Sequence, residues 1–230
     1  RAFIHTALGA VAAHMAGKSE LLLFENGFGA LNLPCDSSQF GSMNSMGTHP
    51  VFLKRMSAFV AALLEEPFAI SNPFLFCTKG QMLSAPSALM RQKMLRDSFS
   101  CDLFPNYHHK ERQCGSCPSC LIRRLSFHSA DIKDQSDYTT DVFRLKRPLR
   151  DAEWTALTKL SRQADTLSSC LDDEDPWKSL CLKWPCLRRA ELEMGSLNFS
   201  EGVCSLLLRH VAEWRSFLSP RNPIPTALAA

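Results

Sequence analysis

The chain of 230 residues is 45% hydrophobic and 21% charged, a globular composition that excludes disordered, collagen-like and coiled-coil classes. Its length suits one or two domains, and its net charge of +3 is too small to indicate nucleic-acid binding. No apolar run approaches the roughly 18 residues that cross a membrane. Because the sequence begins at Arg1, inside an amphipathic segment, we expect it to be a piece of a longer chain.

The first elements alternate between helical and strand patterns. Residues 2–16 predict a helix ended by Gly17, with apolar residues at helical spacing: Phe3, Ile4, Leu8, Val11 and Met15. The run 20–25 (ELLLFE) is typical of a strand buried on both faces in a parallel sheet. The polar segment 26–49 that follows predicts a long loop.

A second helix is expected to begin at Pro50, with a core-facing stripe made of Phe52, Met56, Phe59, Val60, Leu63 and Leu64. Residues 67–70 predict another short strand. Thr78 and Gln81 resemble a capping box that opens a short helix, and a further helix is expected over 86–96. Strand, helix and strand with short connections predict a parallel α/β layer.

The C-terminal part returns to helical patterning after a polar stretch. Residues 136–150 lack periodicity and are the best linker candidate. Residues 151–219 carry helical apolar stripes such as Leu206, Leu207, Leu208, Val211 and Trp214, without any catalytic spacing. We therefore expect a core with a metal site in 1–130, a linker in 131–150 and a helical extension in 151–230.

Four of the ten cysteines lie close together in the sequence: Cys101, Cys114, Cys117 and Cys120. Two-residue spacers let one tight turn supply several thiolates to a tetrahedral zinc ion, and Gly115 and Pro118 favour that turn. An iron–sulfur cluster and unmetallated thiols are the alternatives, and His108 or His109 could replace one cysteine as a ligand. Four thiolates leave no open position, so zinc here would serve stability rather than catalysis. The scattered cysteines indicate small buried side chains in a reducing cytoplasm.

The segment 98–124 (SFSC…CGSCPSCLIRR) resembles the C-terminal signature of the QueC family of 7-cyano-7-deazaguanine synthases. Its last Cys-Gly-x-Cys-x-x-Cys-x-x-Arg run places Arg123 on the family's arginine, and residues 72–83 (NPFLFCTKGQML) are similar to the family's Thr-Lys segment. The resemblance implies an α/β fold with a parallel-sheet, adenine-nucleotide-hydrolase-like (Rossmann-like) core, here without its N-terminal part. It also implies that ATP, with magnesium, adenylates the carboxylate of 7-carboxy-7-deazaguanine, which an amine then attacks.

The sequence departs from the family in ways that affect the expected function. The Ser-Gly-Gly-x-Asp-Ser phosphate loop is absent from these 230 residues, and a long extension follows the cysteine segment. The extension resembles that of longer QueC-like proteins of bacterial anti-phage systems, such as QatC and its type IV CBASS relatives. We expect it to dock a protein partner, with covering of the sheet or homodimer formation as the alternative. A housekeeping synthase of queuosine biosynthesis and a non-catalytic zinc module that binds protein or nucleic acid are the other functions considered.

Candidate substrate residues follow the first expected strand, because ligands of open parallel sheets bind beyond the carboxyl ends of the strands. Glu25 and Asn26 suit the edge of a guanine-like base, and Gly27 lets the backbone approach a planar ligand, although a glycine-rich turn is the plainer interpretation. Further polar candidates, each also a reasonable turn or cap residue, are Asn32, Thr48 and His49. The resemblance implies that Lys79 and Arg123 neutralise phosphate or the substrate carboxylate, and we expect both to share a pocket with Glu25.

Overall fold

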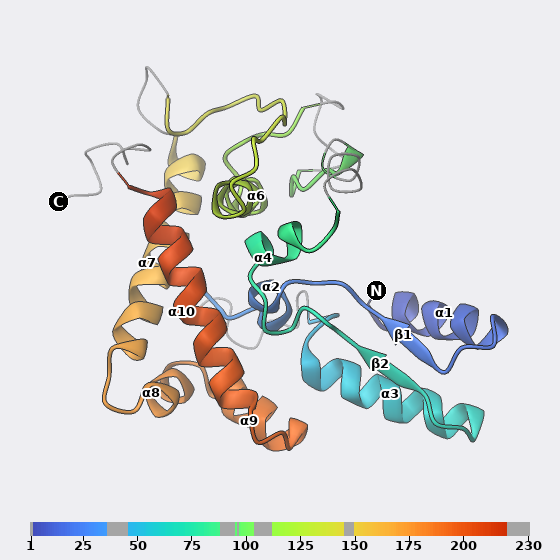
Figure 1. The fold of residues 1–230 in the computed structure, drawn as a ribbon. Coiled ribbons are helices and arrows are strands. Elements are labelled where there is room, and N and C mark those ends of the chain that lie inside the picture. Colours follow the sequence, from blue (N-terminus) through green and yellow to red (C-terminus); the bar gives the residue numbers. More distant parts are fainter. Residues whose placement is uncertain are drawn as a thin grey trace. The chain divides into compact units, whose positions relative to one another are not determined.

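The chain is a helix-rich α/β protein with a small parallel sheet (Figure 1). The computed structural model describes residues 2–35, 46–87, 95, 97–103, 112–144 and 150–219. Packing divides the chain into two compact units, of which the first comprises 1–78 with 169–208 and the second comprises 79–168 with 209–230. The boundary between the units falls within two long helices, α7 (Asp151–Leu171) and α10 (Phe199–Phe217).

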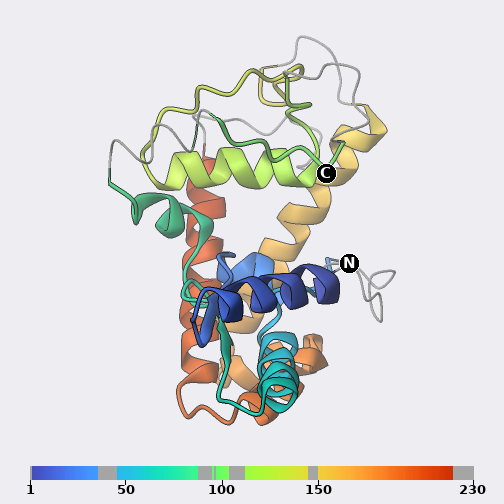
Figure 2. The same cartoon turned by 90° about the vertical axis from the view of Figure 1, so that its right-hand side faces the viewer.

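The first unit contains the sheet. Strand β1 (Glu20–Leu22) pairs in parallel with β2 (Ala69–Ser71), and α3 (Pro50–Leu64) connects them, which confirms the predicted parallel layer. Helix α1 (Ala2–Met15) and α3 pack on the same side of the strands (Figure 2). Their shared core consists of Ala10, Leu53, Met56, Val60, Phe68 and Ile70.

The predicted burial of these elements is only partly right. Leu22 and Phe24 are 42% and 60% exposed, so the strand predicted to be buried on both faces is covered on one face in the described part of the chain. In α3, Leu53 is buried, whereas two residues of the predicted stripe, Phe59 and Leu63, are exposed. The apolar residues that predicted α1 are also exposed, while its buried residues are Thr6 and Ala10. Small side chains therefore face the sheet, because they let the helix approach closely.

A short helix follows each of the two strands along the chain. Helix α2 (Gly27–Leu31) lies within 26–49, so the prediction of an uninterrupted loop there is wrong. A hydrogen-bonding side chain directly before a glycine-containing turn was the signal for this helix. Helix α4 (Lys79–Ser84) confirms the short helix expected after Thr78. Most of the helix expected over 86–96 lies outside the described residues.

The helical character predicted for 151–219 is confirmed. Helices α8 (Pro176–Lys183) and α9 (Pro185–Met194) belong to the first unit, and each begins with proline in its first turn. Trp184 between them is 2% exposed, and its indole Nε1 donates to the carbonyl oxygen of Pro34 at 3.0 Å. This hydrogen bond therefore connects the junction of α8 and α9 to the segment that follows α2.

The second unit is built on α6 (Pro118–Ser129), α7 and the last part of α10. Its core consists of Leu121, Leu125, Val142, Ala156, Leu157, Leu160, Ala164, Trp214 and Phe217. Val142 is 1% exposed and belongs to this core, so the expected linker contributes to the packing of the second unit. The domain division at 130 and 150 stays a prediction about independent folding. Within the described ranges, the structure contains no helix that is long and apolar enough to span a bilayer.

Candidate functional site

Four cysteine side chains meet in the second unit. The Sγ atoms of Cys101, Cys114, Cys117 and Cys120 all lie within 4.8 Å of one another. Cys101, Cys114 and Cys120 are 6%, 5% and 0% exposed, and Cys117 is half-buried. The structure therefore brings together all four ligands predicted from the spacing.

The turn that carries three of these cysteines depends on its glycine and proline. Gly115 has a φ of +80°, and a Cβ atom there would lie 2.0 Å from the carbonyl oxygen of Thr140. Pro118 opens α6, where its missing N–H has no helical partner to lose. Cys117 caps the same helix, because its Sγ accepts a hydrogen bond from the backbone N–H of Cys120 at 3.4 Å.

Backbone N–H groups also donate hydrogen bonds to two more of the cysteine sulfurs. The N–H of Cys114 donates to Sγ of Cys101 at 3.5 Å, and that of Cys117 donates to Sγ of Cys114 at 3.3 Å. The pKa of the Cys117 thiol is lowered to about 6, chiefly by a hydrogen bond from the Cys120 side chain, although burial opposes this shift. Burial raises the pKa of the Cys101 thiol, and the hydrogen bond to Cys117 raises the pKa of the Cys120 thiol, so Cys117 is the most readily ionised of these three thiols. The thiolate is the form that binds metals.

The dimensions of the cluster fit a tetrathiolate zinc site. Zn–S bonds of about 2.3 Å place the sulfurs of a tetrahedron about 3.8 Å apart. The Sγ atoms of Cys114 and Cys120 are 3.8 Å apart. Zinc bound by four thiolates would have no open coordination position, so it would supply cross-linking of the fold. The alternative ligands His108 and His109 lie outside the described residues.

Arg123, on α6, is 4% exposed and donates its hydrogen bonds to the protein. Its Nε donates to Oγ of Ser136 at 2.9 Å, and its Nη1 donates to Oγ of Ser98 at 2.9 Å and of Ser100 at 3.3 Å. Its Nη2 donates to the carbonyl oxygen of Leu95 at 3.1 Å. The guanidinium predicted to meet a phosphate or carboxylate is therefore occupied by neutral oxygens of the chain.

The predicted base-binding pair, Glu25 and Asn26, forms a local network at the carboxyl end of β1. Asn26 is 4% exposed, and its Oδ1 accepts from the N–H of Gly29 at 3.0 Å as the cap of α2. Oε1 of Glu25 accepts from the backbone N–H of Asn26 at 2.9 Å and also from its side-chain amide. Asn26 is thus the cap of a short helix, where the plainer interpretation predicted a glycine-rich turn.

Local structure explains why position 27 is a glycine and position 32 an asparagine. A Cβ atom on Gly27 would lie 1.9 Å from the carbonyl oxygen of Leu75, while its N–H donates to the carbonyl of Cys77 at 2.8 Å. The close approach that Gly27 allows is therefore to this chain's own backbone. Asn32 ends α2 with a left-handed φ of 45°, a conformation that asparagine tolerates better than most residues.

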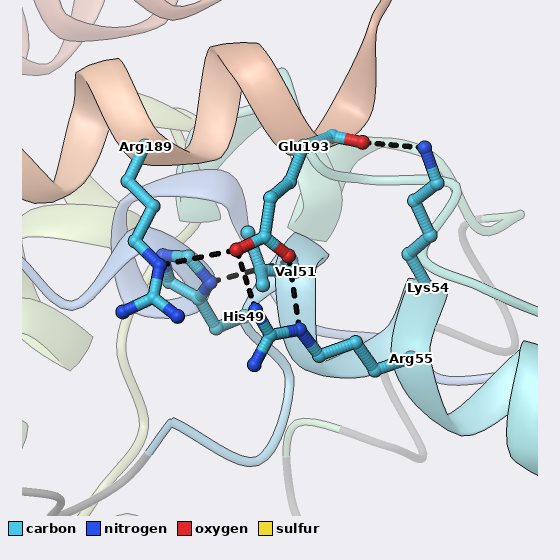
Figure 3. A network of polar contacts seen from close by, with 6 residues as sticks. All are labelled: His49, Val51, Lys54, Arg55, Arg189 and Glu193. Carbon is cyan, nitrogen blue, oxygen red and sulfur yellow. Dashed lines mark hydrogen bonds and ion pairs between the residues drawn. The ribbon is translucent and has the colours of Figure 1, made fainter.

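His49 caps α3, with its Nδ1 accepting from the N–H of Val51 at 3.3 Å. The side chain is 3% exposed, and burial lowers its pKa to about 4, with Glu193 opposing and Arg189 adding to this shift. Figure 3 shows Glu193 of α9 between Arg189 and Arg55, and its Oε1 lies 2.6 Å from Nη2 of Arg55. Neutral His49 therefore anchors the start of α3 beside an ion-pair network.

The predicted substrate residues are distributed over both units. The first unit holds Glu25, Asn26, Gly27, Asn32, Thr48 and His49, of which Thr48 is half-buried in the turn before α3. The second unit holds Arg123 and the half-buried Lys79, which begins α4. The shared pocket of Glu25, Lys79 and Arg123 stays a prediction.

Asn72 is a site residue that the sequence analysis did not single out. It directly follows β2, and its Nδ2 donates to the carbonyl oxygen of Glu25 at 2.8 Å. Its Oδ1 accepts from the N–H of Phe74 at 3.0 Å. Asn72 therefore joins the carboxyl ends of the two strands, and a polar residue immediately after an apolar strand was the available signal.

Comparison with known proteins places the cysteine site within a family signature. Residues 47–131 match the family model described as "Queuosine biosynthesis protein QueC". A 7-cyano-7-deazaguanine synthase of Desulfitobacterium hafniense (strain DSM 10664 / DCB-2) is 31% identical over 109 residues, which cover 44% of each chain. A synthase of the same name from Rhizobium rhizogenes (strain K84) is 28% identical over 88 residues, covering 38% of this chain and 32% of the relative.

The chain spans less than half the length of these curated relatives. No solved structure is significantly similar to it. The matched stretch contains Lys79, Arg123 and all four clustered cysteines. On these grounds residues 47–131 are similar to the QueC family.

Proposed function

We propose that this chain forms part of an ATP-dependent enzyme that activates a 7-deazaguanine carboxylate for attack by an amine. The observation that carries the proposal is the four-thiol cluster inside the stretch that matches the QueC model. The curated relatives that share this stretch are named 7-cyano-7-deazaguanine synthases. Zinc would hold the cysteine loop together, and ATP with magnesium would be the co-substrate.

The proposed reaction has two steps. A carboxylate oxygen of the substrate attacks the α-phosphorus of ATP, which forms an acyl-adenylate and releases pyrophosphate. The amine then attacks the acyl carbon, which forms an amide and releases AMP. In this proposal Lys79 lies against phosphate or carboxylate, because a cation there stabilises the negative charge that develops on the transferred groups.

We further propose that the protein acts in the cytoplasm in anti-phage defence, and that a partner protein supplies the amine that accepts the acyl group. The extension buries most of its predicted stripe, since Leu206, Leu207, Val211 and Trp214 are at most 4% exposed. Surface leucines remain on it for a partner, with exposed fractions of 52% to 100%: Leu182, Leu192, Leu197 and Leu208. A housekeeping synthase would use ammonia in place of this partner, and a zinc-containing binding module would need neither ATP nor the amine.

AMP formation tests the proposal. We expect a protein that contains this chain together with the phosphate loop absent from these 230 residues to produce AMP from ATP only when both 7-carboxy-7-deazaguanine and an amine donor are supplied. Lys79→Ala should lower this rate at least tenfold while leaving the unfolding temperature unchanged, because Lys79 is half-buried at the start of a short helix. Mass spectrometry distinguishes the acceptors, since a modified partner protein gains the mass of the deazaguanine acyl group. If that loop-containing protein is folded and holds zinc but forms no AMP, the enzyme is contradicted and the binding module is favoured.

A further inference from the structure

We propose that Arg123 is a positioning residue that holds Cys101 within reach of the other three thiols, and thereby sets the affinity of the site for its metal. The proposal rests on the metal site of the proposed function and is independent of the reaction. It gives the buried guanidinium a role in assembling the site, in place of the predicted contact with a phosphate or carboxylate.

Cys101 is the ligand that needs external positioning. Cys117 and Cys120 are fixed by the first turn of α6, and Cys114 precedes them in the same Gly115-containing turn. Cys101 is separated from Cys114 by twelve residues of sequence, so local turn geometry does not place it. The segment directly before Cys101 must therefore be attached to the rest of the site.

Arg123 makes this attachment. It follows Cys120 by three residues on α6, so its base is fixed to the helix that carries two of the ligands. Its guanidinium donates to Ser98 and Ser100, the last of which immediately precedes Cys101. The planar fork can hold several acceptors at fixed angles, which a single ammonium cannot do. One side chain thus links the helix ligands to the arm that carries Cys101.

The same arm has a second attachment beside Cys114. Oε1 of Gln113, a residue 4% exposed, accepts from the backbone N–H of Ser100 at 3.1 Å. The backbone N–H of Gln113 donates in turn to the carbonyl oxygen of Asp137 at 2.9 Å. Because Arg123 also bonds Ser136, its guanidinium lies where three segments of the site converge.

Zinc affinity of the full chain measures this role. We expect Arg123→Lys to weaken zinc binding about 10- to 100-fold in competition with a chromogenic chelator, as changes in the residues supporting metal ligands commonly do. With cobalt(II) in place of zinc, the variant should lose part of the sulfur-to-metal charge-transfer absorption, because Cys101 leaves the coordination shell. A substitution that merely loosened packing would leave this absorption per bound metal unchanged.

Arg124→Lys is the matched control. Arg124 is the next residue on α6, and it bonds Oδ1 of Asp141 at 2.7 Å and lies 4.9 Å from the ring centroid of Tyr138. It makes none of the contacts to Ser98 or Ser100 described for its neighbour, so its conservative replacement should leave zinc affinity within about twofold. An equal loss of affinity in both variants would overturn the positioning role.

A double variant keeps the proposal testable if Arg123→Lys fails to fold. Ser98→Ala with Ser100→Ala leaves the guanidinium in place and removes two of its acceptors, so zinc affinity should fall in the same direction. Parent-like zinc affinity in this double variant would overturn the proposal. If the parent binds zinc and Arg123→Lys binds it equally well, the positioning role alone fails. If the parent binds no zinc, the metal site of the proposed function fails with it.

Discussion

Gly115 and Gly195 both have left-handed backbones, with φ of +80° and +62°, but their surroundings differ. A Cβ on Gly115 would meet the carbonyl of Thr140 at 2.0 Å, whereas nothing lies within 4 Å of one on Gly195. We expect Gly115→Ala to lower the free energy of unfolding by about 3 kcal/mol, and Gly195→Ala by about 1 kcal/mol from backbone strain alone. Urea unfolding of the zinc-bound chain measures both. Equal losses would contradict the enclosed turn at the metal site.

His49 makes the stability of the chain depend on pH. Burial lowers its pKa from 6.5 to about 4, so the unfolded chain binds more protons between these values. The stabilising effect of neutral His49 is therefore complete above pH 6.5 and is lost as the pH falls toward 4. His210 has the same lowered pKa from burial, so the comparison must isolate His49.

His49→Asn provides that isolation, because asparagine retains a side-chain oxygen for the cap of α3 and does not titrate. Between pH 7 and pH 4, the parent should lose up to about 3 kcal/mol more unfolding free energy than the variant. Chemical denaturation at a series of pH values gives the difference. Parallel curves for the two proteins would show that His49 is not held neutral by the fold.

At the scale of the helix, α10 divides one apolar run between core and surface. Leu207 is fully buried, whereas Leu208 is 52% exposed. Leu207→Ala should cost about 2–5 kcal/mol of unfolding free energy through the cavity it leaves, and Leu208→Ala less than about 0.5 kcal/mol. Thermal and urea unfolding of the two variants test this division. A large loss from Leu208→Ala would mean that this surface position is covered in the native protein.

Elements with strong apolar periodicity, or with residues that typically begin or end a helix, could be predicted from the sequence. Pro50 marks the first turn of α3, as predicted, and cysteine spacing identified all four thiols of the cluster, whereas helix α6 was not predicted. The buried faces could not be predicted as well, because periodicity shows that a helix has two faces but not which one meets a neighbour. In α1 the small residues Thr6 and Ala10 pack inward while larger apolar side chains remain exposed.

In the candidate site, too, the sequence does not show which groups a given side chain contacts in the folded protein. The sequence predicts Asn26 to be a ligand group or part of a glycine-rich turn, and His49 to be a ligand group or a cap. In the structure each caps a helix, and their ligand roles stay predictions. The contacts of Arg123 to Ser98 and Ser136 depend on tertiary folding, so no local pattern reveals them. A polar residue beyond a strand is a candidate by position alone, and its partners decide whether it faces a ligand or the chain.

At the scale of the whole molecule, the residues expected to serve one reaction lie in two compact units. The cluster of four cysteines belongs entirely to the second unit, together with α6 and the segment 136–140 that packs beside it. Loss of the metal should therefore first affect this second unit. The first unit keeps its own core around the β1–β2 pair and α3.

Measuring the zinc content together with the unfolding temperature tests the proposed structural zinc site most directly. Elemental analysis of the purified chain should give one zinc per molecule, and Cys117→Ser should lower both the zinc content and the unfolding temperature. The physical reason is that a four-thiolate site contributes its binding free energy to folding. Chelation under mildly denaturing conditions should shift the parent toward the unfolding temperature of the variant. A metal-free parent that unfolds at the same temperature as the zinc-loaded protein would contradict a structural role for zinc at these four cysteines.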